Sequence, residues 1–216
     1  MTLRARRAPG ADRKLSIGAG PALAAAVSAL LLATCGHSPP TRFYTLDPRP
    51  PAASGPRVSG AGPVRILAVR VPPMLDRLEV TRQIQPAEVQ VDDLARWSAP
   101  LGDLARDALA QDLAERLPGV AILPARSSAP AGARDLTVEI LSLRHAGRAF
   151  ELDATVELAD AASGAIVDQQ HVRLSAAAER TDAAAEAEAL SRLLAALADR
   201  ISPRIAGPAV AASGGD

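Results

Sequence analysis

The chain has 216 residues, of which 48% are apolar and only 2% aromatic, which allows one domain with appendages and a core of aliphatic residues and alanine. Residues 1–34 hold five of the 24 basic and one of the 24 acidic residues, so the remainder carries 19 basic and 23 acidic residues, a formal net charge of −4. This acidic body argues against nucleic-acid binding, and the single cysteine excludes an internal disulfide.

Residues 1–34 are typical of an export signal. Basic residues up to Lys14 precede an apolar run whose strongest part, residues 22–33, is shorter than the ~20 residues of a membrane-spanning helix. The run ends in Leu32-Ala33-Thr34-Cys35, which resembles the lipobox of bacterial lipoproteins. We therefore predict a signal peptide over residues 1–34, cleavage before Cys35, and acylation of Cys35 by diacylglycerol and a further fatty acid such as palmitate.

Two alternatives to the lipobox are an ordinary secretory signal and an uncleaved anchor. The short apolar run disfavours the anchor, and the position of the cysteine at the end of the run favours lipidation. Gly36 follows the cysteine, where an aspartate would favour retention in the inner membrane. The expected location is therefore the outer membrane, with the protein lipid-anchored and facing the periplasm.

The segment after Cys35 reads as a tether, a brief strand and a linker. Residues 35–63 contain a polar tether, a strand at about residues 42–46, and a stretch rich in Pro, Gly, Ala and Ser. Residues 64–71 predict a buried strand, and residues 79–82 and 88–91 predict two short strands. Asp92 or Asp93 is then expected to cap a turn of helix that carries Leu94 and Trp97.

The second half of the chain alternates between helical and strand patterns. Apolar spacing predicts amphipathic helices over residues 101–117 and 183–201, the first ended by Pro118-Gly119. Strands are predicted at residues 120–123, at 136–143 with a bulge near Leu141, at 150–158, and at an edge over 166–176. The expected fold is α+β, a mainly antiparallel sheet covered by two helices, with the domain over residues 64–203 and a flexible tail over 204–216.

No catalytic or cofactor motif occurs in the sequence. There is no G-x-S-x-G elbow, phosphate loop or dinucleotide fingerprint, and the three histidines lack metal-ligand spacing. Glu151, Asp153 and Glu157 share one face of a strand and imitate a catalytic pair, but a solvated strand face explains them better. We expect no enzymatic activity, no cofactor and no metal.

Three segments resemble a known family. They are Pro39-Pro40 and Phe43-Tyr44-Thr45-Leu46 behind the lipobox, Val69 to Arg77 with its Pro-x-x-Leu-Asp-Arg turn, and Arg96-Trp97-Ser98-Ala99-Pro100-Leu101 before the first helix. In this order they are similar to the ABC-type transport auxiliary lipoproteins, the PqiC-like family, over about residues 43–201. The chain departs from the pattern at Phe43 and after Arg77.

The resemblance implies a part in moving lipids between the two membranes. Members serve ABC transporters whose MCE-domain proteins cross the periplasm, so the expected partner is an MCE-domain protein docked at the outer membrane. A homo-oligomer is left open, and no nucleic acid is expected. Motif position makes six residues candidates for partner binding: Tyr44, Leu46, Leu75, Asp76, Arg77 and Trp97. The alternatives are an accessory lipoprotein of outer-membrane or lipopolysaccharide assembly and, more remotely, an anchored enzyme.

Overall fold

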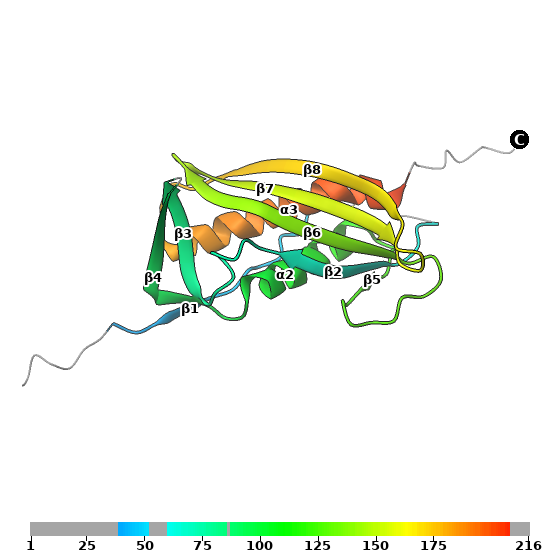
Figure 1. The fold of residues 1–216 in the computed structure, drawn as a ribbon, viewed down its shortest axis with the longest axis horizontal. Helices are drawn as coiled ribbons and strands as arrows, with labels where there is room; N and C mark the ends of the chain where they lie inside the picture. The colour runs from blue at the N-terminus through cyan, green and yellow to red at the C-terminus, as the bar shows by residue number, and fades with distance from the viewer. Residues whose placement is uncertain (1–38, 52–59, 86, 208–216) are drawn as a thin grey trace, which may run out of the picture. The chain divides into compact units, whose positions relative to one another are not determined.

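A computed structural model describes residues 39–51, 60–85 and 87–207 (Figure 1). The predicted signal peptide, Cys35, Gly36, part of the linker and residues 208–216 lie outside the described residues. The described residues from Pro40 onward belong to one compact unit.

A five-stranded sheet has the order β5-β2-β6-β7-β8. Its strands are β2 (Val64–Arg70), β5 (Ile122–Leu123), β6 (Arg134–Ala146), β7 (Ala149–Asp160) and β8 (Ile166–Ala177). β2 runs parallel to β5 and β6, whereas β6, β7 and β8 form antiparallel pairs. The sheet is therefore mixed, with its longest pairings antiparallel, and the predicted α+β class is confirmed.

Period-two alternation determines which side of the sheet is buried. In β7, Phe150 and Leu152 and every second residue to Leu158 are buried, while the residues between them are partly exposed. The predicted bulge in β6 is confirmed, because its register with β7 shifts between Ile140 and Ser142 and leaves Leu141 half exposed. β8 lies at the edge, as its mixed pattern predicts.

Two helices, α2 (Leu101–Arg116) and α3 (Ala183–Ala206), cover the apolar face of this sheet (Figure 1). Asp182 caps α3, since its carboxylate accepts a hydrogen bond of 2.8 Å from the Ala185 amide. The helix runs through Pro203 to Ala206, although the flexible tail was expected to begin at residue 204. Proline removes one helical hydrogen bond there, but Ile205 remains buried and its carbonyl accepts a bond from Arg134.

A second sheet has three strands in the order β1-β4-β3. Its strands are β1 (Arg42–Tyr44), β3 (Glu79–Gln85) and β4 (Glu88–Trp97), with β1 parallel and β3 antiparallel to β4. The helical turn expected at Asp92 or Asp93 is wrong, because β4 continues through an irregular register to Trp97. The Asp92 carboxylate does accept the Leu94 amide at 3.1 Å, but β1 and β3 supply the remaining backbone partners that favour a strand.

Residues 35–63 were expected to precede the domain, but the described part of this segment from Pro40 onward belongs to the domain. β1 pairs with β4, and Leu46 is buried in the core. The Asp47 amide donates to Ser191 Oγ at 3.1 Å, and the Arg49 amide donates to Asp112 Oδ1 at 2.7 Å. The domain therefore begins near β1 and not at residue 64.

Candidate functional site

Three of the six candidate partner-binding residues are core residues. Leu46, Leu75 and Trp97 are 6%, 3% and 2% exposed, so none of them presents a contact surface. Tyr44 is partly buried against the same core, on the face of β1 that it shares through register with Trp97. The family-like segments that suggested these candidates contain both core residues and surface residues. Position in the sequence alone does not distinguish the two.

The Pro-x-x-Leu-Asp-Arg turn shows this division clearly. The amides of Leu75 and Asp76 both donate to the Pro72 carbonyl, at 2.8 and 3.2 Å. Burial of Leu75 fixes the turn to the core, which leaves Asp76 and Arg77 exposed. Arg77 Nε lies 3.4 Å from a carboxylate oxygen of Glu79. Leu75 therefore positions the turn, and Asp76 and Arg77 form its outer surface.

A depression of about 460 Å³ lies beside this turn. Close packing shapes it, because a Cβ on Gly102 would lie only 2.6 Å from the Val69 carbonyl oxygen. The first turn of α2 therefore lies directly against the end of β2. The depression brings together two of the family-like segments and the start of α2, and we call it the docking depression. It is lined by Val69, Arg70, Val71, Asp76, Pro100, Gly102 and Asp103.

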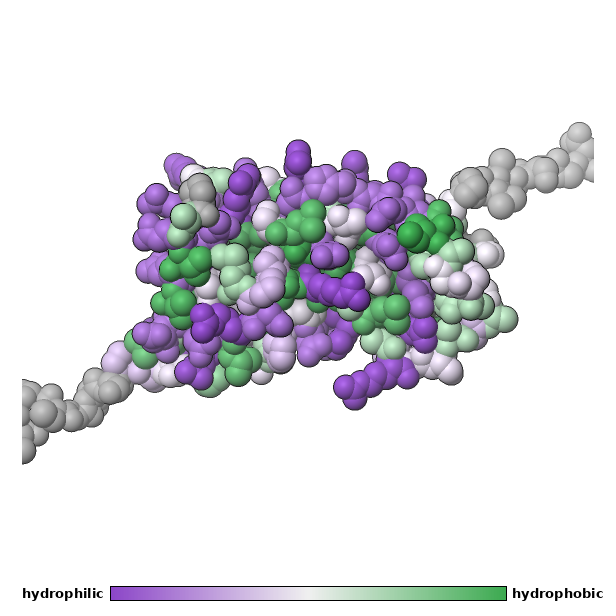
Figure 2. Space-filling model, in the orientation of Figure 1, coloured by the Kyte–Doolittle hydropathy of each residue, from purple (hydrophilic) through white to green (hydrophobic). Residues whose placement is uncertain are grey.

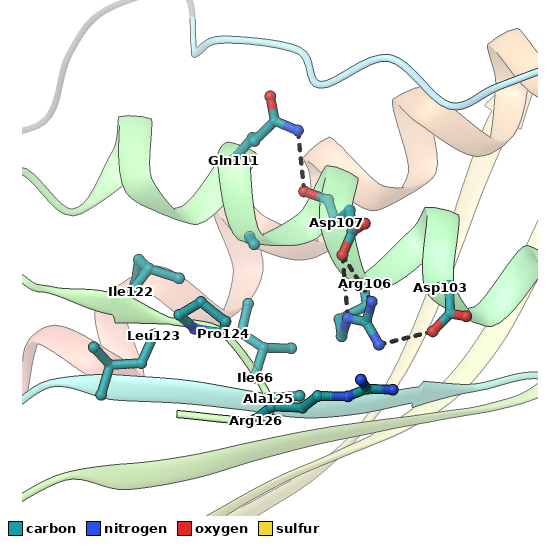
Figure 3. Close-up of a pocket in the computed structure, with 11 residues that line it drawn as sticks. Ile66, Asp103, Arg106, Asp107, Gln111, Ile122, Leu123, Pro124, Ala125 and Arg126 are labelled. Carbon is teal, nitrogen blue, oxygen red and sulfur yellow. Dashed lines mark hydrogen bonds and ion pairs between the residues drawn. The ribbon is translucent and has the colours of Figure 1, made fainter. Parts of the chain in front are cut away.

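A second hollow, of about 540 Å³, lies between α2 and the loop after β5 (Figure 3). Its lining includes the apolar side chains of Ile66, Ile122 and Leu123. On the α2 side, the Arg106 guanidinium binds Asp103 Oδ1 at 2.7 Å and Asp107 Oδ1 at 3.0 Å (Figure 3). The Asp103 and Asp107 carboxylates on this rim are thus already paired with Arg106. Sequence reasoning missed this hollow, because a short strand and a loop form its far wall.

Two carboxylates on the acidic face of β7, Asp153 and Glu151, are paired with residues of the neighbouring strands β8 and β6. Asp153 binds the His171 ring, and Arg173 Nε donates to its other oxygen at 3.1 Å. Desolvation acts in the opposite direction, but these hydrogen bonds outweigh it and hold the pKa of Asp153 below its ordinary value. Glu151 is paired with Arg144 at 2.8 Å. These contacts keep both carboxylates occupied on an exposed strand face.

Two buried ionic clusters hold the helices to other elements. Arg116 donates to Asp199 Oδ1 at 2.6 Å and to the Arg49 carbonyl at 3.0 Å, and it lies 3.4 Å from Asp112. Burial raises the pKa of Asp112, although the Arg49 amide and Arg116 oppose the shift. This cluster clamps the segment after β1 onto α2 and α3.

The other cluster joins the β3–β4 hairpin to α3. Arg82, which is 7% exposed, donates to the Thr181 carbonyl at 2.7 Å and lies 3.7 Å from Asp92. Glu186, in the first turn of α3, is 2% exposed. Burial raises its pKa to about 8, in spite of the nearby charge of Arg82. Glu186 is therefore largely uncharged at neutral pH.

Neither a metal cluster nor a membrane-spanning helix occurs in the part of the chain that the structure describes. No group of three or more His, Cys, Asp or Glu side chains is arranged to hold a metal there. Neither α2 nor α3 has the length and apolar character needed to cross a bilayer.

Comparison with known proteins identifies the family. The family model described as "ABC-type transport auxiliary lipoprotein component" matches residues 44–202. A crystal structure of an uncharacterized protein aligns with TM-score 0.60 and 18% identity over 77% of this chain and 99% of its own. Protein XCC0632 from Xanthomonas campestris aligns with TM-score 0.59 and 17% identity over 75% of this chain and 93% of its own. No curated protein matches the sequence.

The two structural matches show the fold alone, since both fall below 25% identity. The family match runs from Tyr44, the last residue of β1, to Ser202 in α3, and so takes in most of both sheets and both helices. It confirms the resemblance seen in the three sequence segments. The chain belongs to the family of ABC-type transport auxiliary lipoprotein components.

Proposed function

We propose that this protein docks the MCE-domain component of an ABC-type lipid transporter at the outer membrane, where acyl chains on Cys35 anchor it. Its role is binding and not catalysis, and it needs no cofactor. The observation that carries the proposal is that two separate family-like segments, Val69 to Arg77 and Arg96 to Leu101, contribute to one exposed depression.

The docking depression has the properties of a recognition surface. Its backbone is fixed by burial of Leu75 and by the contact of Gly102 with Val69, so little conformational freedom is lost on binding. Arg70, Asp76 and Asp103 place charges of both signs around its apolar and backbone surface. Such a pattern favours specificity and orientation in a complex.

A pull-down of the tagged lipoprotein from crosslinked whole envelopes tests the proposal. The double variant Asp76→Arg, Arg77→Glu reverses both exposed charges of the turn without touching Leu75. The matched control is Glu115→Arg, an exposed charge reversal near the end of α2, away from the docking depression. We expect the wild type and the control to recover an MCE protein with its permease and ATPase, and the double variant to recover much less of them.

Two results would contradict the proposal. Equal recovery from all three proteins would show that the docking depression is not part of the interface. Recovery of only barrel-assembly or lipopolysaccharide-assembly proteins by the wild type would replace transport with an assembly role. Outer-membrane anchoring is tested separately by density fractionation of envelopes, where Cys35→Ser should abolish both acyl labelling and membrane association.

A further inference from the structure

The three-stranded sheet has an apolar outer surface. Phe43 on β1 is 69% exposed, and on β4 Val89, Val91 and Leu94 are 42%, 38% and 41% exposed. Hydrophobic residues are visible among polar ones over the β3–β4 end of the molecule (Figure 2). Exposed apolar side chains gathered on one sheet are typical of a contact surface. We call these four residues the hairpin surface.

Strand register places Phe43, Val91 and Val89 on one side of the sheet, and Trp97 and Val80 on the other. Phe43 is opposite Arg96, Val91 opposite Thr81, and Val89 opposite Gln83. The alternate residues, such as Trp97 and Val80, are buried in the core. Leu94 lies in the irregular stretch of β4, directly before the buried Ala95. The opposite face is therefore covered near β1, whereas towards the hairpin turn Ile84 on that face is 38% exposed; on the near face Thr81, opposite Val91, is buried.

The length of the tether limits how far this surface lies from lipid. Cys35 stands seven residues before Arg42, the first residue of β1. Seven residues span at most about 25 Å when fully extended. With acyl chains on Cys35 inserted in the bilayer, β1 and the strand paired to it stay within that reach of the membrane. The part of the domain that the tether holds nearest the membrane is therefore the part that carries the hairpin surface.

We propose that the hairpin surface lies against the membrane that holds the anchor, with Phe43 inserted at the boundary between headgroups and acyl chains. The inference rests on lipidation of Cys35, which is part of the proposed function. Aromatic and aliphatic side chains favour this boundary. Because the anchor already holds the domain at the surface, a weak additional contact is enough to orient it.

The charges near the hairpin surface indicate that apolar burial drives the contact. Arg42, next to Phe43, is exposed and makes no ion pair with any residue in the described ranges, so it is free to meet a lipid phosphate. Glu88 and Asp93 on β4 oppose attraction to anionic lipid. The contact should therefore change little with salt concentration.

The test compares two substitutions, each of which adds one tryptophan to the full-length lipidated protein. Phe43→Trp places a reporter on the hairpin surface, and Ile166→Trp places one at a site that is 58% exposed at the start of β8. The hairpin contacts the other end of the sheet, near Arg144 to Ala146, so Ile166 is roughly 35 Å of strand away. Trp97 is 2% exposed and gives the same background in both proteins.

Each protein is reconstituted into vesicles of phosphatidylethanolamine and phosphatidylglycerol, with and without brominated acyl chains, which quench tryptophan on contact. We expect bromolipid to quench Phe43→Trp strongly and Ile166→Trp little, with the difference unchanged in high salt.

Flotation of the vesicles separates failure of this inference from failure of the proposed anchor. Proteins that float but show no quenching at position 43, or equal quenching at both positions, overturn the membrane contact and leave the anchor intact. A tryptophan at position 43 that bromolipid does not quench, but that becomes shielded from solvent when the transporter component is added, also overturns the membrane contact. That result would assign the hairpin surface to a protein partner. Proteins that do not float overturn both the anchor and the contact.

Discussion

Replacing Glu186 by glutamine should remove a large pH dependence from the stability of the domain. The folded protein holds Glu186 at a pKa of about 8, against an ordinary value of 4.5, because burial disfavours the charged carboxylate. A raised pKa means that the folded state binds a proton that the unfolded state has released. The stabilising effect of that proton is complete below about pH 4.5 and is lost as the pH rises toward 8.

The magnitude follows from the gap between the two pKa values. At ~1.4 kcal/mol for each pH unit, the wild type should lose up to roughly 5 kcal/mol of unfolding free energy over this range from Glu186 alone. Glu186→Gln keeps the size of the side chain and cannot ionise. The variant should therefore show a much flatter profile and should exceed the wild type in stability above about pH 8.

Urea unfolding followed by the fluorescence of Trp97, the only tryptophan, measures this at a series of pH values from 5 to 9. Trp97 is suited to the purpose because it is buried in the core. Glu188→Gln is the matched control, since Glu188 lies one half-turn further along α3 with its side chain 54% exposed. Parallel profiles for the wild type and Glu186→Gln would show that Glu186 is charged in the folded protein and would refute the reasoning.

Three further substitutions test the packing of the domain by urea unfolding followed by far-ultraviolet circular dichroism, which does not depend on Trp97. Arg116→Ala should lower the unfolding free energy by about 3–5 kcal/mol, because it leaves the buried Asp112 without its cation. Arg106→Ala should lower it by less than about 1 kcal/mol, because its partners Asp103 and Asp107 are exposed. Equal losses from the two variants would contradict the clamp at Arg116. Trp97→Ala should lower the unfolding free energy by about 3–5 kcal/mol, because it truncates a core side chain. An unchanged unfolding midpoint would show that Trp97 is not a core residue in solution. Gly62→Ala should cost about 1–3 kcal/mol or more, because its Cβ would lie 2.1 Å from the Gly132 carbonyl oxygen; a neutral effect would mean that this loop contact does not persist in solution.

The sequence alone determined the elements with strong local periodicity. Strict alternation over residues 150–158 identified β7 and its buried side, and apolar spacing identified α2 and most of α3. The change of phase at Leu141 located the bulge in β6. These features follow from the backbone period of each element, so neighbouring residues contain the necessary information. The order of short motifs identified the family in the same way, without any long-range contact.

Only the tertiary structure decided which motif residues are buried and what surrounds them. Leu46, Leu75 and Trp97 occur in segments with weak periodicity. The burial of Trp97 accompanies pairing between β1 and β4, about fifty residues apart in the chain, and Leu75 is buried from a turn. The clamp at Arg116 joins α2 to Arg49 and Asp199, and the docking depression joins the end of β2 to the start of α2. Such sites are set by contacts between distant segments, which a local sequence pattern does not encode.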